Sequence, residues 1–424
     1  MKVLLTSIGT RGDMEPFLAL GEILKAAGHE TVCLMPEQFR ALAEAGGHTF
    51  ESLGPEFMEL LDSDLGKLAL GGSGTALQKL LAYTKLQKQY AQINILLMQR
   101  QQEVVERLQP DRIVHSAKVI YPMVWALSHP GKTLVVSPIP YVLHAVRNQA
   151  HVAFNRNLGP LLNKWSYQLA LWGLTRHILT TSKSLTLTKH PAKAELRRAL
   201  LRAPALYTVS PTLFEGPPEW PDQVRVVGYH ERNKMQDWSP SLALLKFLEK
   251  HPRCLMVTFG SMTSPRPERN TQVLLDTLAR LSIPAILVTA GGGIQQPEIY
   301  YKDLFHFEKT IPYEWILPKV YGLIHHGGSG TTHLAVKYGC ASLIIPHIID
   351  QFLWNRILSS KGLGPKGPGI TKISQARLLS LFKDLWENPS YKDTARELSA
   401  AMKAENFREE ILERIVGMEE TESS

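Results

Sequence analysis

The segment Gly327–Thr331, with the sequence GGSGT, combines residue types and a position that suit the binding of an anion. It follows the β-rich run YGLIHH, which ends at His326, and it precedes the helix-forming run THLAVKYG. Backbone N–H groups in a glycine turn and at a helix N-terminus converge on one point, where the helix dipole favours negative charge. The hydroxyl groups of Ser329 and Thr331 add donors. The sequence therefore predicts an anion site, although glycines at such a turn also serve tight packing without a ligand.

Two further polar residues, Asp350 and Gln351, follow this turn by about twenty positions. They come directly after the strand-like run SLIIP and the short segment HII. Ligands of an open parallel sheet bind outside the carboxyl ends of its strands. We therefore expect both side chains to lie near the bound anion.

The letters GGSGT occur a second time, at Gly71–Thr75, in a different setting. The run LGKLAL precedes this copy and ALQKLLAYTKLQKQ follows it, so no β-branched strand orients its amides toward a ligand. We interpret it as a mobile loop near an acceptor.

The elements that must position these residues alternate as in an α/β protein. The chain opens with KVLLTSI, a helical run PFLALGEILKAAG that stops at Gly28, and ETVCLMP, which together predict a βαβ unit. The rhythm continues through DRIVHS, KTLVVSP and ALYTVSP and breaks at a proline-rich stretch, 211–240. It restarts with CLMVTFGSM, a helix from about Glu268 to Leu281, AILVTAGGG, YGLIHHGGSG, a helix to about Tyr338, and ASLIIP.

Two Rossmann-like sheets in 424 residues predict two domains. We expect an N-terminal, acceptor-binding domain over 1–214, a linker over 215–240 and a C-terminal, nucleotide-sugar-binding domain over 241–395. The Glu-rich stretch from about Tyr391 to Glu420 indicates a helix. We expect the last segment, 396–424, to be a helix and a frayed tail that pack across the domains.

The net charge of +8 is concentrated between His144 and Ala203. Ten Lys or Arg residues stand there against Glu195 alone, so 144–203 carries +9 and the rest of the chain is nearly neutral. These charges alternate with apolar side chains such as Trp165 and Trp172, which suits an anionic membrane surface better than a nucleic acid. A solvated helical face is an equally weighted alternative. We expect peripheral membrane contact through 144–203 and no nucleic-acid partner.

Composition points to a cytoplasmic protein. The longest apolar candidate, Leu169–Leu179, is interrupted by Arg176 and His177, and no run of about 18 apolar residues occurs. The three cysteines are far apart, which fits a reducing compartment and suggests neither a disulfide framework nor a zinc site.

Three motifs resemble those of one family. The stretch 325–358, HHGGSGTTHLAVKYGCASLIIPHIIDQFLWNRIL, is similar to the nucleotide-sugar signature of the UDP-glycosyltransferase superfamily with the GT-B fold. The segment 9–30, GTRGDMEPFLALGEILKAAGHE, resembles the opening of its sterol and lipid glucosyltransferases and its glycopeptide-antibiotic glycosyltransferases, and VTFGSM at 257–262 is a third match. The motifs span nearly the whole chain, while about 55–205 matches none. The resemblance implies an α/β GT-B fold, in which two Rossmann-like domains with parallel sheets face a cleft.

The resemblance also implies a donor site for a nucleotide sugar such as UDP-glucose. His326 and the amides of Gly328–Gly330 would bind the diphosphate, Thr331 and Ser261 its oxygens, and Asp350 and Gln351 the sugar hydroxyls. Preorganised donors stabilise the charge that leaves with the diphosphate, so a metal ion becomes dispensable. We expect no metal and no cofactor. The donor-binding candidates are Ser261, His326, Gly328, Ser329, Gly330, Thr331, Asp350 and Gln351.

Asp13 is the candidate general base. It follows the first strand by a short glycine-containing loop, so it would project from the carboxyl edge of the sheet into the interdomain cleft. The alternative is a cap for the helix PFLALGEIL, with Pro16 in its first turn, and a capping carboxylate is already occupied. Arg11, beside Gly12, could reach the diphosphate or pair with Asp13.

Other features weaken a metal site and limit the resemblance. Asp62-Ser63-Asp64 matches the DxD pattern of metal-dependent glycosyltransferases but lies in an acidic, helix-like stretch. Many family members carry a ribose-binding Glu where this chain has Leu334. The aromatic residue that stacks on uracil in plant members is replaced near Pro312, which leaves UDP and dTDP both open.

We therefore expect an inverting, metal-independent hexosyltransferase whose acceptor is a sterol, carotenoid, lipid or polyketide. Closure of the two domains about the linker would exclude water. Two alternatives stay open. One is a nucleotide-sugar epimerase, which would need additional acid and base residues around the sugar. The other is a nucleotide-sugar sensor or scaffold without catalysis.

Overall fold

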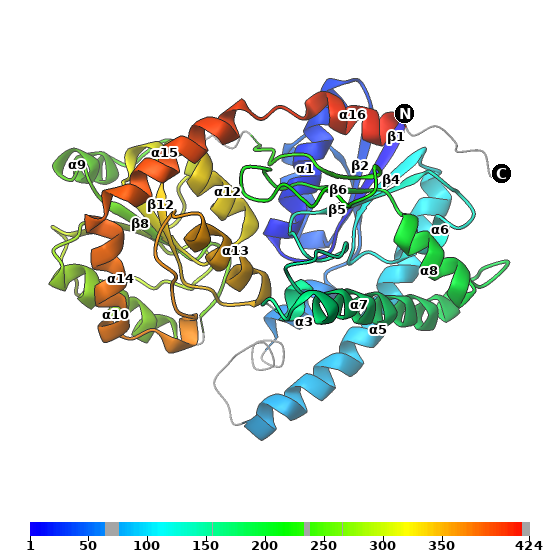
Figure 1. Cartoon of the computed structure of the whole chain (residues 1–424), viewed down its shortest axis with the longest axis horizontal. Coiled ribbons are helices and arrows are strands. Elements are labelled where there is room, and N and C mark those ends of the chain that lie inside the picture. Colours follow the sequence, from blue (N-terminus) through cyan, green and yellow to red (C-terminus); the bar gives the residue numbers. More distant parts are fainter. Residues whose placement is uncertain (64–75, 155, 233–237, 265, 418–424) are drawn as a thin grey trace. The chain divides into compact units, whose positions relative to one another are not determined.

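The computed structural model describes residues 1–63, 76–154, 156–232, 238–264 and 266–417. The chain divides into two compact units, Met1–Arg232 with the segment from Asn406, and Asn233–Glu405. Each contains one parallel sheet (Figure 1). The glycine turn at 71–75 and Asp64 of the DxD tripeptide lie outside the described residues.

The first unit is built on a seven-stranded sheet with the strand order β3-β2-β1-β4-β5-β6-β7. All its neighbouring strands pair in parallel. The strand order reverses between β1 and β4, because the chain runs from β1 outward to β2 and β3 and then returns to the other side of β1. The strands are β1 Lys2–Thr6, β2 Glu30–Met35, β3 Thr49–Ser52, β4 Arg112–Ser116, β5 Thr133–Ser137, β6 Ala205–Tyr207 and β7 Val224–Val226.

Helices cover both faces of this sheet, so its central strands are apolar on both sides. In β1, Val3 and Leu5 join a core with α1, whereas Leu4 joins a second core with α5, α7 and α8 on the opposite face (Figure 1). The helices are α1 Arg11–Ala26, α2 Arg40–Ala45, α3 Glu56–Asp62, α5 Ala76–Leu108, α6 Tyr121–Trp125, α7 Pro160–Thr181, α8 Lys193–Arg202 and α16 Arg408–Val416.

The second unit holds a five-stranded parallel sheet with the order β10-β9-β8-β11-β12, which reverses between β8 and β11. Leu274 of α10 and Phe382 of α14 are buried in one core with Val257 of β8. The strands are β8 Leu255–Thr258, β9 Ala285–Val288, β10 Phe305–Glu308, β11 Gly322–His325 and β12 Ala341–Ile344. The helices are α9 Leu242–Lys250, α10 Pro267–Arg280, α11 Tyr313–Ile316, α12 Ser329–Lys337, α13 Ile349–Ser360, α14 Gln375–Glu387 and α15 Pro389–Ala404. The α/β class with two parallel sheets is confirmed.

The stretch predicted as a linker, 215–240, contributes to the first sheet. Strand β7 lies inside it and pairs with β6, and the first unit extends to Arg232. Arg232 is buried and forms ion pairs with Glu15 (3.3 Å) and Glu22 (2.9 Å) of α1. The prolines of this stretch gave no sign of a strand in the sequence. A three-residue edge strand is still possible there, because edge strands tolerate neighbouring residues that break regular structure.

The Glu-rich C-terminal stretch forms two helices, not one. Helix α15 ends at Ala404 in the second unit, and α16 belongs to the first unit, where Ile411 and Ile415 enter the core beside α1. Arg414 of α16 also donates a hydrogen bond to the backbone oxygen of Asp222 (2.9 Å). The chain therefore passes from the first unit to the second and back.

Candidate active site

The predicted site residues lie at the two places where strand order reverses. In the first sheet, the loop after β1 leads to Asp13, and Lys118 follows β4. In the second sheet, Ser261 follows β8 and His326 follows β11. Loops that leave neighbouring strands in opposite directions open a crevice at such a point, and ligands of open α/β sheets bind there. Both reversal points therefore qualify as ligand sites.

The glycine turn of the second unit has the geometry of an anion site. Gly328 is the N-cap of α12, and the helix starts at Ser329, so the first N–H groups of the helix point out of its N-terminal end. Gly327 has a φ of +92°, and an added Cβ would lie 2.6 Å from the Cγ2 of Ile344. Only glycine fits there, and its absent side chain lets the turn pack closely against β12.

His326 enters this turn with a buried side chain. Its ring lies close to Gly260 and to Gly328, where an added Cβ would lie 2.9 Å and 2.4 Å from the ring. Burial, and after it the neighbouring His325 and His347, lower the pKa of His326 well below its usual value, so the ring is neutral near pH 7. Its Nδ1 has no hydrogen-bond partner among the described residues. A buried, unpartnered ring nitrogen is costly unless a ligand or water satisfies it.

His325 is fully buried in β11. Its Nδ1 accepts a hydrogen bond from the N–H of Gly327 (3.2 Å), and burial lowers its pKa to about 3. This histidine therefore supports the turn through its Nδ1.

Three loops of the second unit meet at the reversal point. The loop after β8 carries Gly260 and the exposed Ser261, and the backbone oxygen of Gly260 accepts a hydrogen bond from the N–H of Gly291 (3.0 Å) in the loop after β9. Pro312 caps α11, whose Tyr313 hydroxyl lies 3.1 Å from the Oγ1 of Thr258 at the end of β8. Ser261, His326 and Pro312 thus follow strands that end at one edge of the sheet.

Gln351 and Asp350 lie in the first turn of α13, beside α12 (Figure 1). The Gln351 side chain is buried, and its Oε1 accepts hydrogen bonds from the N–H groups of His347 (2.7 Å) and Ile348 (3.2 Å). Its observed contacts hold the N-terminal turn of the helix. The carboxamide oxygen of Gln351 is therefore already bonded within the chain, and the sugar contact of this residue stays a prediction. Asp350 is half-buried at the helix N-terminus.

Asp13 occupies the first turn of α1. The helix starts at Arg11, and Thr10 is its N-cap. With Asp13 as the N-cap, the helix would have started three residues later, at Met14. The Oδ2 of Asp13 accepts a hydrogen bond from the N–H of Thr10 (2.9 Å), which is half of a capping box. Asp13 therefore takes part in capping, from inside the helix.

Lys118 is a member of this site that the sequence interpretation missed. Its Nζ lies 2.5 Å from the Oδ1 of Asp13, with the lysine side chain 52% exposed and the aspartate 18% exposed. Arg11, by contrast, pairs with Glu15 (2.9 Å), one helical turn away, and not with Asp13, which was one of the possibilities left open for it. Gly12 lies between Arg11 and Asp13 in the first turn of α1. Parallel pairing of β1 with β4 brings residues 13 and 118 together, and sequence spacing alone gives no signal of it.

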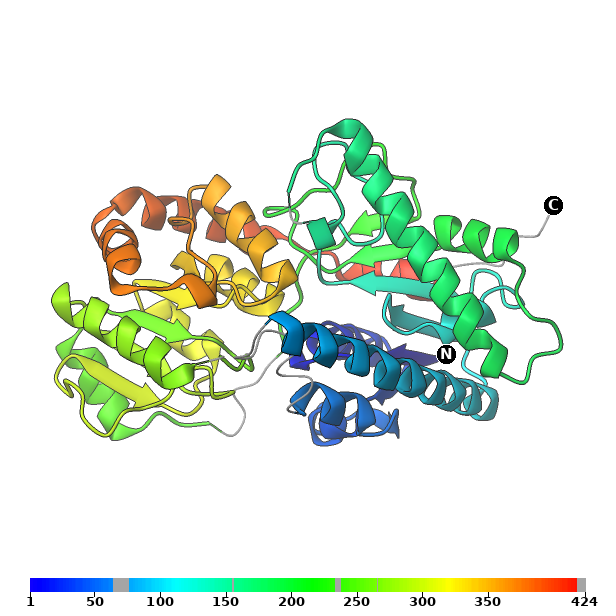
Figure 2. The same cartoon turned by 90° about the horizontal axis from the view of Figure 1, so that it is seen from below.

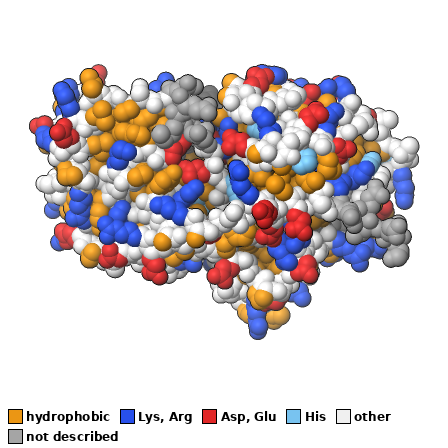
Figure 3. Space-filling model, turned by 90° about the horizontal axis from the view of Figure 1, so that it is seen from above, with side chains coloured by type: hydrophobic (Ala, Val, Ile, Leu, Met, Phe, Trp, Pro, Cys, Tyr) orange, Lys and Arg blue, Asp and Glu red, His pale blue; other side chains and the backbone are white. Residues whose placement is uncertain are grey.

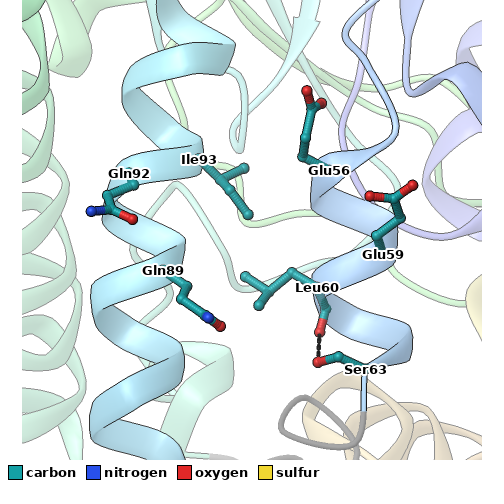
Figure 4. Close-up of a pocket in the computed structure, with 7 residues that line it drawn as sticks. All are labelled: Glu56, Glu59, Leu60, Ser63, Gln89, Gln92 and Ile93. Atoms are coloured by element: carbon teal, nitrogen blue, oxygen red, sulfur yellow. Dashed lines mark hydrogen bonds between the residues drawn. The ribbon is translucent and has the colours of Figure 1, made fainter.

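A separate open hollow lies between α3 and α5, with a volume of about 450 Å³ (Figure 4). Leu60 and Ile93 point toward each other across it, and Ser63 donates a hydrogen bond to the backbone oxygen of Leu60 (2.7 Å). The remaining lining side chains are polar: Glu56, Glu59, Gln89 and Gln92.

Across the described ranges, no three His, Cys, Asp or Glu side chains gather as a metal site. Within the same ranges, no helix is both long and apolar enough to cross a bilayer.

Two family models match the chain, one near each end. The model "Glycosyltransferase family 28 N-terminal domain" matches residues 3–113, and "Erythromycin biosynthesis protein CIII-like, C-terminal domain" matches 303–418. A sterol 3-beta-glucosyltransferase of Arabidopsis thaliana is 25% identical over 96% of this chain, which spans 66% of that relative. An O-mycaminosyltylonolide 6-deoxyallosyltransferase of Streptomyces fradiae is 27% identical over 96% of this chain and 94% of its own length.

Solved structures share the fold over nearly the whole chain. The glycotransferase of kitacinnamycin superposes with a TM-score of 0.70 at 14% identity, covering 98% of both chains. The Streptomyces sp. SF2575 glycosyltransferase SsfS6, complexed with thymidine diphosphate, gives 0.61 at 18% identity, covering 98% of this chain and 99% of its own. These likenesses identify the fold as GT-B.

Proposed function

We propose that this chain is a glycosyltransferase with the GT-B fold that moves glucose from UDP-glucose to a hydroxyl group of a hydrophobic acceptor. The observation that carries the proposal is the turn before α12. Its N–H groups and the neutral, buried His326 donate hydrogen bonds to a diphosphate, and none of these donors carries a net charge. A leaving diphosphate gains charge during transfer, and fixed dipoles of this kind stabilise it most at that moment.

The reaction is an inverting single displacement. The acceptor hydroxyl gives its proton to Asp13 while its oxygen bonds to the anomeric carbon, and the bond from that carbon to the diphosphate breaks. Thr10 and Lys118 hold the two Asp13 oxygens, but a carboxylate has about four acceptor positions, so a hydroxyl can still bind. Turnover requires the two units to bring Asp13 and the anomeric carbon into contact.

The relatives support the proposed donor and acceptor without fixing them. Glucose and a sterol-like acceptor fit the sterol glucosyltransferase, whereas the antibiotic relative and the structure with thymidine diphosphate make dTDP the second donor to test. A polyketide is then the second acceptor class. The donor side chains proposed for this reaction are His326, Ser261, Ser329, Thr331 and Asp350, with the amides of Gly328 and Gly330. Cys33, Cys254 and Cys340 are buried with free thiols, which fits a cytoplasmic enzyme.

A binding protein without catalysis is the second candidate. Both Asp13 oxygens already have partners within the first unit, and a base that is permanently occupied would leave a nucleotide-sugar sensor. This candidate predicts tight binding of UDP and no acceptor-dependent release.

The test is the release of UDP from UDP-glucose by the full chain in excess chelator, with and without a mixture of sterols and other hydrophobic alcohols. We expect release that depends on acceptor and survives chelation, together with a product heavier by one hexose in mass spectrometry. dTDP-glucose in a parallel reaction ranks the two donors. Binding of UDP without release of nucleotide from either donor would contradict the transferase and favour the sensor. Loss of release in chelator would replace the metal-independent mechanism.

A further inference from the structure

The first three turns of helix α7 expose an apolar stripe, from Leu161 to Trp172. Leu161 is 85% exposed, Trp165 61% and Trp172 49%, and Leu162 and Leu169 are exposed on the same side. The spacings of four, four and three residues from 161 to 165, 169 and 172 place these side chains on one helical face. Contiguous apolar patches of this kind are uncommon on a protein surface unless something binds there.

The opposite side of α7 is firmly attached to the first unit. Ile178 is buried in the core below the sheet, and Asn163 and Ser166 are buried with hydrogen bonds to the loop before the helix. Asn163 donates to the backbone oxygen of Arg147 (2.9 Å), and the N–H of His151 donates to the Oγ of Ser166 (2.9 Å). The exposed stripe is therefore held in place and does not belong to a loosely packed helix.

Exposed basic side chains lie on α7 and on the neighbouring helix α8. Helix α7 contains no acidic residue and carries Lys164 and Arg176, both exposed. Helix α8 packs against α7 and adds exposed Lys193, Arg197, Arg198 and Arg202. Figure 2 shows α7 running across the near face of the first unit. On the opposite face, in Figure 3, basic and acidic side chains are intermixed.

We propose that the stripe of α7 and the basic side chains of α7 and α8 form a docking surface for an anionic lipid bilayer. Trp and Leu side chains enter the boundary between headgroups and acyl chains, where the amphipathic indole ring is favoured. Long Lys and Arg side chains reach the anionic headgroups while their stems cover apolar surface. Arg176 already lies over the Trp172 ring at 5.6 Å.

The positive charge of this surface favours a bilayer over a second copy of the chain as its partner. A symmetric dimer through α7 would place the basic side chains of both copies against each other, which costs free energy. An anionic bilayer compensates the same charges. The proposal of this docking surface is independent of the proposed transfer reaction. Its test measures binding to vesicles and does not use enzyme activity.

The test is vesicle flotation of the full chain with phosphatidylcholine vesicles, with and without about one third phosphatidylserine. We expect binding to the anionic vesicles only, and weaker binding as salt shortens the Debye length from about 10 to 3 Å. The variant Trp165→Ser/Trp172→Ser should bind roughly tenfold more weakly or worse. The control Ile299→Ser/Tyr301→Ser, which removes exposed apolar side chains of the second unit, should bind as the native chain does.

A second variant, Arg197→Gln/Arg198→Gln, tests the charges and should lose most of the salt dependence. Circular dichroism of each variant establishes that it is folded. Three outcomes would overturn the proposal: no binding of the native chain to anionic vesicles, equal binding by the tryptophan variant, or a native dimer in light scattering that this variant abolishes. Binding to duplex DNA that needs the arginines but not the tryptophans, without binding to vesicles, would also overturn it.

Discussion

The two strand-reversal points of this molecule use different physical means. In the second unit, the turn before α12 offers backbone N–H groups and an uncharged histidine, all fixed by close packing of glycines. In the first unit, Asp13 and Lys118 form a charged pair that is partly open to solvent. Rigid dipoles suit a diphosphate, and a carboxylate that can exchange partners suits proton transfer. The same sheet topology thus supports two kinds of site.

The largest expected effect is on the rate at the charged pair. Asp13→Asn keeps an oxygen that can accept the Thr10 N–H but loses the base, so we expect UDP release to fall about 10²- to 10⁴-fold, with unchanged UDP affinity. Asp13→Ala should lose the same activity and, in addition, about 0.5–2 kcal/mol of stability through the lost cap. Initial rates, calorimetric UDP titration and urea unfolding measure the three quantities. A native rate in Asp13→Asn would reduce this residue to a helix cap.

At the rigid turn the effect should fall on binding. Gly327→Ala places a Cβ against Ile344 at a positive φ, so we expect UDP affinity to drop about tenfold or more, with a stability loss of about 1–3 kcal/mol. Gly339→Ala is the matched control, because it strains a positive φ of +67° at the other end of α12 where space is available. Calorimetry should show native affinity in the control. Equal losses in both variants would mean that strain, not the turn, weakens binding.

Acid should destabilise the histidine-rich second unit. Burial lowers the pKa of His325 to about 3 and those of His333 and His347 to about 4. Unfolding lets each of them bind a proton below its ordinary pKa of about 6.5, so their stabilisation is complete above that pH and is lost as the pH falls from about 6.5 through about 4 for His333 and His347 and about 3 for His325. His333→Gln should reduce the slope of stability against pH by up to about 1.4 kcal/mol per unit. Urea midpoints from pH 7.5 to 5 measure it, and an unchanged slope in His333→Gln would contradict this account.

The smallest effect is expected from Lys118. Because its side chain is about half exposed, removing the ion pair in Lys118→Met should cost less than about 1 kcal/mol of stability. We expect a few-fold change in the rate of UDP release and none in UDP affinity, while Lys118→Arg retains the rate. A loss of UDP affinity in Lys118→Met would place this lysine at the donor and blur the contrast between the two sites.

The sequence predicted the fold best where local pattern and packing agree. The helix expected from about Glu268 to Leu281 spans Pro267–Arg280, and the one expected to end near Tyr338 ends at Lys337. Both follow fully buried strands and carry glycine or proline signals at an end. The short edge strand β7 carries only three residues among prolines, so its pairing with β6 depends on tertiary contacts that periodicity does not report.

For the site, residue types were easier to predict than partners. The glycine turn and His326 are adjacent in the sequence, so their local geometry could be inferred from the order strand, turn, helix. Lys118 lies 105 residues from Asp13 and reaches it only through the pairing of β1 with β4. Arg11 and Gln351 were assigned to ligands, whereas each has a partner within its own helix or at its N-terminal end.

The return of α16 to the first unit has a consequence for synthesis on the ribosome. Ile411 and Ile415 complete a core that begins with Val3, so this unit cannot finish folding until 173 residues of the second unit, 233–405, have been translated. At roughly 5–20 residues per second, the unfinished core waits on the order of ten to thirty seconds. During that interval, the face of α1 that α16 will cover is exposed to chaperones and to other nascent chains. The second unit, contiguous in the chain, can reach its final structure first.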